Sequence, residues 1–152
     1  MSDLETLPGH LIRRLQQIAV ALFSTRMGEA DIDLTAVQFA ALMTLRDHPG
    51  LDQQTLAGMI AYDRVTLGGV IDRLEQKDLV VRETSPTDRR ARILNLTEEG
   101  RQTLDRAIPW VDRVQEEILA GLSDEEQAMF MTLLSKLTRA GNELSRAPLR
   151  GR

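Results

Sequence analysis

Two short segments near the middle of this chain interrupt an otherwise helical spacing of apolar residues. Residues 79–84 and 92–96 are rich in aliphatic and β-branched side chains and predict strands, and the Ser-Pro-Thr-Asp sequence at 85–88 favours a turn between them. Elsewhere the apolar residues recur at intervals of three and four, as in amphipathic helices. We therefore predict a mainly α-helical fold with one small β-hairpin.

Four helices are expected before the hairpin, and three of them begin at a capping residue. They span about residues 7–28, 35–47, 53–60 and 64–77. Thr35 and Gln38 form a capping box for the second helix, and Asp52 and Asp63 are suited to cap the third and fourth. Two short helices separated by a few residues predict a helix-turn-helix.

Two more helices are expected after the hairpin, over about residues 97–122 and 124–146. Thr97 is suited to cap the first, and Ser123 opens the second. Pro109 lies inside the first helix and predicts a kink, because proline removes one backbone hydrogen bond. Residues 147–152 include proline, glycine and two arginines, and we expect them to fray.

The composition argues against catalytic and metal sites. The sequence contains no cysteine, so disulfides and thiol chemistry are excluded, and its two histidines, His10 and His48, are far apart. No phosphate-binding glycine loop or nucleophile elbow is present. We therefore expect no enzyme, no metal and no cofactor. Without a long apolar run or a signal-peptide pattern, we expect a cytoplasmic protein with no membrane partner.

Positive charge is concentrated around the hairpin, although the formal net charge of the chain is −4. Between residues 80 and 93, four arginines stand against two acidic residues: Arg82, Arg89, Arg90 and Arg92 against Glu83 and Asp88. A narrow basic hairpin tip after a helix-turn-helix predicts contact with DNA, whose minor groove attracts arginine. The alternative is an ordinary solvated loop.

The first and last helices carry more apolar surface than one helix-turn-helix core can cover. Their stripes are Leu11, Leu15, Ile18 and Leu22 in the first helix, and Leu133, Leu137 and Leu144 in the last. Pairing of two copies across a two-fold axis would bury both stripes. We therefore predict an obligate homodimer with recognition helices about 34–36 Å apart.

Four stretches, in order along the chain, resemble the MarR family of bacterial transcriptional regulators. They lie at residues 34–39, 71–75, 88–92 and 96–101, and the resemblance extends over about residues 7–144. It implies a single domain over residues 1–152, with a winged helix-turn-helix at about 35–97 and dimerisation helices at about 7–28 and 124–146. It further implies a homodimeric repressor bound to double-stranded DNA at a pseudo-palindromic operator.

The resemblance assigns DNA contacts to the recognition helix and to the hairpin, which would form the wing. The residues are Arg64, Thr66, Gly68, Gly69 and Arg73 in the helix, and Asp88, Arg89, Arg90 and Arg92 in the wing. We expect Arg90 to enter the minor groove, with Arg89 as the alternative, and Asp88 to hold the wing arginines in place. The family usually has glycine at Asp78, and polar or basic residues at Gly68 and Gly69; bare backbone there would let the duplex approach, unless the glycines are neutral drift.

The segments at residues 10–14 and 63–69 resemble those of family members that control the breakdown of aromatic acids. This implies release from DNA by a small organic effector, an aromatic acid or its thioester. His10 and Arg14, four residues apart on one helix face, would bind its carboxylate; the alternative is a simple surface pair. The alternative function is a winged-helix module that binds protein without direct DNA contact.

Overall fold

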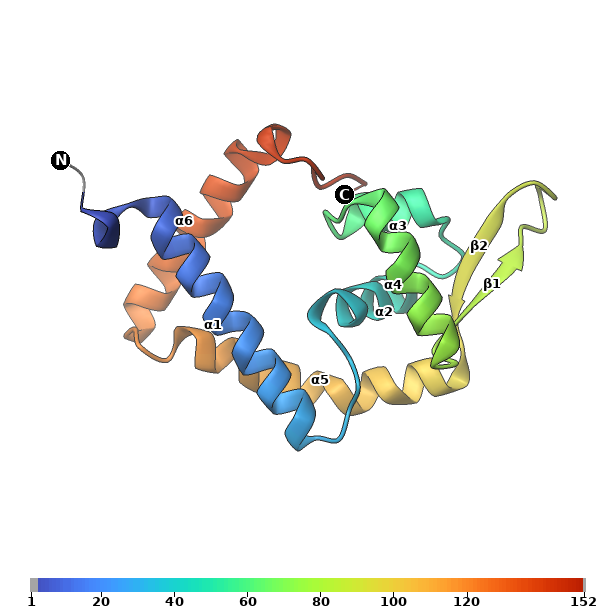
Figure 1. Ribbon diagram of the computed structural model, residues 1–152, viewed down its shortest axis with the longest axis horizontal. Helices are drawn as coiled ribbons and strands as arrows, with labels where there is room; N and C mark the ends of the chain where they lie inside the picture. Colours follow the sequence, from blue (N-terminus) through green and yellow to red (C-terminus); the bar gives the residue numbers. More distant parts are fainter. Residues whose placement is uncertain (1–2, 152) are drawn as a thin grey trace.

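The computed structural model describes residues 3–151, which form six α-helices and one β-hairpin. The helices are α1 (Pro8–Glu29), α2 (Ala36–Asp47), α3 (Gln53–Met59), α4 (Arg64–Gln76), α5 (Glu98–Leu119) and α6 (Asp124–Ala140), with short 3₁₀ turns η1 (Leu4–Thr6) and η2 (Asn142–Leu144). Strands β1 (Val80–Thr84) and β2 (Arg92–Leu96) pair antiparallel. In Figure 1, α1 and α6 lie at one end, and α3, α4 and the hairpin lie at the other. The predicted fold class is confirmed.

Side-chain caps set the start of most helices where the sequence places them. The capping boxes at Thr35 and Ser123 are both complete, and Asp52 and Asp63 each accept a backbone N–H from the first turn that follows. Asp78 has a left-handed backbone with φ +60°, a conformation that favours glycine, the residue that the resembled family usually has there. Helix α6 is shorter than predicted and ends at Ala140.

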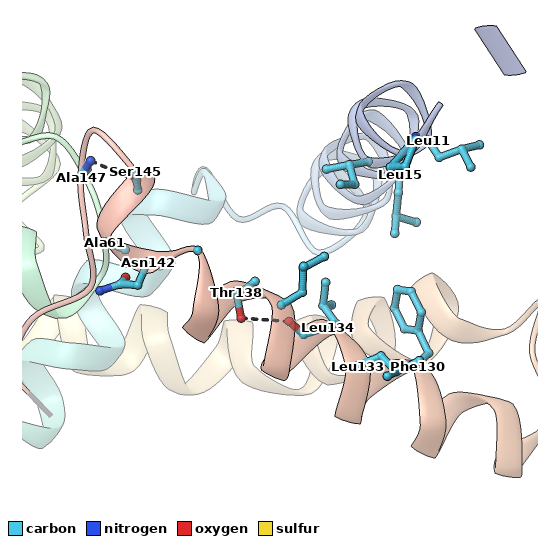
Figure 2. A pocket seen from close by; sticks show the side chains of 14 residues that line it. Leu11, Leu15, Ala61, Phe130, Leu133, Leu134, Thr138, Asn142, Ser145 and Ala147 are labelled. Atoms are coloured by element: carbon cyan, nitrogen blue, oxygen red, sulfur yellow. Dashed lines mark hydrogen bonds between the residues drawn. The ribbon is translucent and has the colours of Figure 1, made fainter. Parts of the chain in front are cut away.

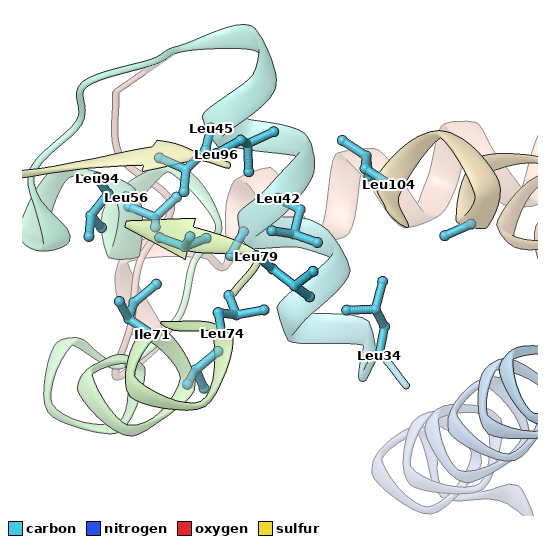
Figure 3. Packing of buried hydrophobic residues seen from close by; sticks show 14 of the residues in the cluster. Leu34, Leu42, Leu45, Leu56, Ile71, Leu74, Leu79, Leu94, Leu96 and Leu104 are labelled. Atoms are coloured by element: carbon cyan, nitrogen blue, oxygen red, sulfur yellow. The ribbon is translucent and has the colours of Figure 1, made fainter. Parts of the chain in front are cut away.

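The core is a cluster of aliphatic side chains between the helix-turn-helix, the hairpin and α5. Figure 3 shows leucines from α2, α3, α4, β2 and α5 converging on it, together with Leu79 just before β1. The four-residue stripe of α4, Leu67, Val70, Ile71 and Leu74, is buried entirely within this cluster. Because that stripe faces inward, the opposite face of α4 is fixed toward the outside of the molecule.

The start of α5 packs unusually closely against the start of the hairpin. A β-carbon placed on Gly100 would lie 2.0 Å from the carbonyl oxygen of Leu79. The same oxygen accepts the backbone N–H of Thr97, the N-cap of α5. Only a residue without a side chain fits this position, so Gly100 sets how closely α5 approaches the hairpin.

The end of the chain is docked, and the expectation that residues 147–152 fray is wrong for the described part of them. The side-chain amide of Asn142 bonds the backbone of Leu149 in both directions, at 2.8 and 3.2 Å. The N–H of Arg150 donates to the carbonyl of Gly58 at 2.7 Å, and its guanidinium pairs with Glu143. Specific hydrogen bonds thus outweigh the disorder that the composition predicts.

Pro109 lies within the unbroken helix α5, so it does not terminate the helix, and the kink expected there stays a prediction. Across residues 3–151, no helix has the length and apolarity needed to cross a membrane.

Candidate nucleic-acid interface

Asp63 orders the first turn of α4, at the end of the molecule remote from α1. Its Oδ1 accepts the backbone N–H of Thr66 at 2.9 Å and the hydroxyl hydrogen of the same residue at 3.0 Å. These two bonds hold the pKa of Asp63 below its usual value, and the bond from the backbone N–H has the larger effect. The helix therefore presents a fixed N-terminal turn, the part of a recognition helix that contacts base edges.

Among the polar residues of α4 that are expected to contact DNA, the two arginines have fewer bonds within the protein than Thr66. Arg64 and Arg73 are exposed, and neither forms an ion pair with any residue in 3–151. Thr66 is also exposed, but its hydroxyl hydrogen is donated to Asp63. Its hydroxyl oxygen can still accept a hydrogen bond, whereas its hydrogen is not free to reach a base.

The two glycines of α4 face different surroundings. Gly69 is exposed, and a β-carbon added there would meet no atom of another element within 4 Å in the described part of the chain. A β-carbon on Gly68 would lie 3.3 Å from Nε2 of Gln53, the first residue of α3. Bare backbone is therefore presented outward at Gly69, whereas Gly68 makes room for a side chain of the neighbouring helix.

The tip of the wing is held by short-range hydrogen bonds. The N–H of Ser85 donates to the carbonyl of Ala91 at 2.9 Å, and the Ser85 hydroxyl accepts the N–H groups of Thr87 and Asp88. Asp88 in turn accepts the backbone N–H of Arg90 at 2.9 Å. The tip is thus a structured turn.

The three wing arginines, Arg89, Arg90 and Arg92, are exposed. In the part of the chain that the structure describes, none of them is within ion-pair distance of an acidic group. Asp88 therefore orders the wing through the backbone of Arg90 and not by a salt bridge to an arginine side chain. Three unneutralised charges at one tip make a local site of positive potential.

Arg82 ties the wing to the recognition helix, a role that its charge alone did not predict. From β1 it reaches Asp72 at 2.7 Å and also pairs with Glu75, both on α4, and it lies 3.4 Å from Oε1 of Gln53. Partial burial acts to lower the pKa of Arg82, but the hydrogen bonds to the two carboxylates outweigh it and raise the pKa. The network fixes β1, α3 and α4 relative to one another.

An apolar groove of about 710 Å³ lies between α1 and α6. Figure 2 shows Leu11 and Leu15 of α1 facing Phe130, Leu133 and Leu134 of α6 across it. All residues of α6 are described, and none is buried in the single chain. The groove contains only part of the two predicted stripes, because Leu22 packs against the core and Leu144 lies beyond α6 in η2.

The structure does not pair His10 with Arg14. The ring Nδ1 of His10 lies 3.3 Å from Nη2 of Arg13, and Arg14 is exposed. Neither His10 nor Arg14 is among the described residues that line the groove between α1 and α6. The ligand site expected at these two side chains therefore stays a prediction.

Helices α2, α3 and α4 followed by a two-stranded hairpin place a helix and a narrow basic loop side by side, one suited to the major groove and the other to the minor groove. This arrangement defines the winged helix-turn-helix class of DNA-binding proteins.

Comparison with known proteins narrows the class. Residues 34–91 match the model of the MarR family. The transcriptional repressor NicR of Pseudomonas putida is 36% identical over 129 residues, covering 85% of this chain and 80% of NicR. The chain belongs to the MarR family and is a DNA-binding transcriptional regulator.

Two solved structures are similar over almost their whole length. Bordetella bronchiseptica BpsR, described with regulation of its DNA binding by 6-hydroxynicotinic acid, superposes with a TM-score of 0.84 at 31% identity, covering 91% of this chain and 97% of BpsR. The repressor CouR, solved bound to a 23-mer DNA duplex, superposes with a TM-score of 0.81 at 31% identity, covering 91% of this chain and 96% of CouR.

Proposed function

We propose that this protein is a homodimeric repressor that binds a pseudo-palindromic operator and is released by a small aromatic carboxylate or its thioester. The observation that carries the DNA-binding part is the wing: three exposed arginines at and beside its ordered tip, none paired with an acidic group among residues 3–151, next to a capped recognition helix. A repressor of this kind has no catalytic step to perform, and it acts where the DNA is, in the cytoplasm.

The proposed dimer uses α1 and α6. Leu11 and Ile18 of α1 and Leu133 and Leu137 of α6 are each about half exposed or more in the single chain. Covering such a contiguous surface is worth roughly 25 cal/mol per Å² of apolar area. In this proposal residues 1–152 form one domain, with dimerisation segments at about 7–28 and 124–146 and the winged helix-turn-helix at about 35–97.

The proposed DNA contacts divide between the two grooves. Arg64, Thr66 and Arg73 contact the major groove or its flanking phosphates, with Gly69 allowing close approach and Gly68 admitting Gln53 behind the helix. Arg90 enters the minor groove, with Arg89 and Arg92 beside it, and Asp88 orients the tip through the Arg90 backbone.

The effector is proposed from chemistry and from relatives. Without cysteine there is no thiol trigger, and within residues 3–151 no cluster of acidic or histidine side chains could hold a metal. BpsR is described as regulated by an aromatic acid. Arg14 is suited to a carboxylate because its planar guanidinium donates two parallel hydrogen bonds, with His10 nearby on the same helix. The partner subunit would complete the site.

Gel shifts at two salt concentrations, using the DNA upstream of the protein's own gene, test the DNA-binding part. Arg90→Ala should weaken binding and reduce the salt dependence by about one released cation per subunit, because binding then displaces fewer counterions from the DNA. Arg106→Ala, which removes an equal charge from an exposed position in the middle of α5, is the matched control and should leave the slope unchanged. Failure of the wild type to bind DNA would favour the protein-interaction alternative.

Calorimetric titration with a panel of aromatic acids and their thioesters tests the effector. At least one member should bind the wild type and release it from DNA, and Arg14→Ala should weaken that binding. Arg106→Ala, an equal change of charge on α5, should not. Absence of heat from every panel member, or equal affinity in Arg14→Ala, would refute the ligand class or the site.

A further inference from the structure

The outward face of α4 carries an aliphatic side chain that the packing of the protein does not use. Val65, the second residue of the helix, is 86% exposed, whereas the apolar stripe that begins at Leu67 is buried. Valine is a poorer helix former than alanine, because its β-branch restricts side-chain rotation. An exposed valine here therefore contributes neither to the core nor to the helix.

Gly69 continues the same feature one turn further along the helix. Residues four apart share a helix face, so Val65 and Gly69 lie one above the other, pointing away from the core. Apart from the backbone of α4 and the two adjacent residues, no atom of residues 3–151 lies within 4 Å of where a Gly69 β-carbon would be, so the space above it is open. Glycine, like valine, disfavours a helix. At both positions the protein gives up helix propensity and presents only C–H surface outward.

We propose that Val65 recognises the C5-methyl group of a thymine in the major groove. This rests on the proposed binding of DNA through α4. The N-terminal residues of a recognition helix contact base edges, and the thymine methyl is the one apolar group on the major-groove edges of the four bases. The neighbouring Thr66 cannot donate from its hydroxyl, because Asp63 holds that hydrogen. At this position the base is thus selected by burial of a methyl group.

The size of the effect follows from burying one methyl group. Removing one buried methyl should weaken binding about fourfold in each half-site. In a symmetric operator bound by two subunits, the loss should be about fifteenfold. Such a ratio is easily measured, and it is smaller than the loss expected for an arginine that bonds a guanine in two places.

The test removes the methyl group from the DNA and the valine from the protein separately. A tight-binding duplex is first selected from random sequences with the full-length protein. Each symmetry-related pair of thymines is then replaced by uracil, which lacks only the C5-methyl group. Affinities are measured for the wild type, for Val65→Ala, and for Val20→Ala as the matched control, the same change at an exposed valine of α1.

One pair of thymines should give a ratio of about fifteen between thymine and uracil duplexes in the wild type and in Val20→Ala. The ratio should fall to near one in Val65→Ala, with unchanged helix content by circular dichroism. Equal ratios in the wild type and Val65→Ala at every thymine would overturn the assignment of Val65. If the wild type selects no duplex at all, the proposed DNA-binding function fails, a result distinct from binding with unaltered ratios.

Discussion

Replacing Gly100 with alanine should lower the thermal stability of the protein, because the added methyl group has no room. Its β-carbon would lie 2.0 Å from the Leu79 carbonyl oxygen, while carbon and oxygen ordinarily approach no closer than about 3.3 Å. The obstructing atom belongs to the backbone, and it already accepts the Thr97 N–H, so it cannot turn aside. Helix α5 and the hairpin must therefore separate by about 1 Å.

The cost can be set against the gain in helix propensity. Overpacking of this kind costs about 1–3 kcal/mol, and alanine returns at most about 1 kcal/mol relative to glycine in a helix. Because a backbone atom is the obstruction, we take the cost at the upper end of that range, which leaves a net loss of about 2 kcal/mol in the free energy of unfolding. For a chain of this length, that corresponds to a fall in Tm of about 4–8 °C.

The measurement is thermal unfolding followed by circular dichroism, with all variants at one protein concentration, because the Tm of a dimer depends on concentration. Gly28→Ala is the matched control: Gly28 is also helical, but a β-carbon there meets no atom within 4 Å. Its Tm should stay level or rise. If Gly100→Ala and Gly28→Ala have the same Tm, the close approach of α5 to the hairpin has been misjudged.

Three further predictions concern other parts of the molecule. Arg82→Met should loosen the wing from α4, costing about 1 kcal/mol of stability and several-fold in DNA affinity, as denaturant titration and gel shift would show, unless the wing is held by its strand pairing alone. Asp63→Asn should keep the cap but make stability depend less on pH in the acid range. The pKa of Asp63 is depressed in the folded protein, so its contribution to stability is present above about pH 4 and is lost as the pH falls through the folded pKa. Measuring the Tm at several pH values checks this, and an equal fall of Tm with decreasing pH in the two proteins would contradict it. Asn142→Ala should release the chain end at Leu149, giving faster trimming by carboxypeptidase; an unchanged rate would mean that other contacts hold it.

The elements of this fold that depend on neighbouring residues could be predicted from the sequence. The caps at Thr35, Asp52, Asp63 and Ser123 act within three residues, and the α4 stripe repeats within two turns, so spacing alone locates them. The left-handed backbone at Asp78 agrees with the resemblance to a family that usually has glycine there.

Contacts between distant parts of the chain could not be predicted in this way. Arg82 meets Gln53, 29 positions away, and the bond from Arg150 to Gly58 joins the two ends of the fold. Neither pairing leaves a periodic trace in the sequence, which is why the docked tail was expected to fray. Val65 could have been noticed, since it is an apolar residue outside the α4 stripe, but its exposed fraction needed the structure.

The docked chain end offers an internal probe of movement between the two ends of the molecule. The amide hydrogen of Arg150 is held by the carbonyl of Gly58 in α3, while Asn142, just after α6, holds the adjacent Leu149. That amide can exchange with deuterated solvent only when the tail lifts from α3. Its exchange rate therefore reports, without any attached label, how often the tail leaves α3. A peptide covering residues 145–151 would register that opening by mass spectrometry in free, DNA-bound and effector-bound protein alike.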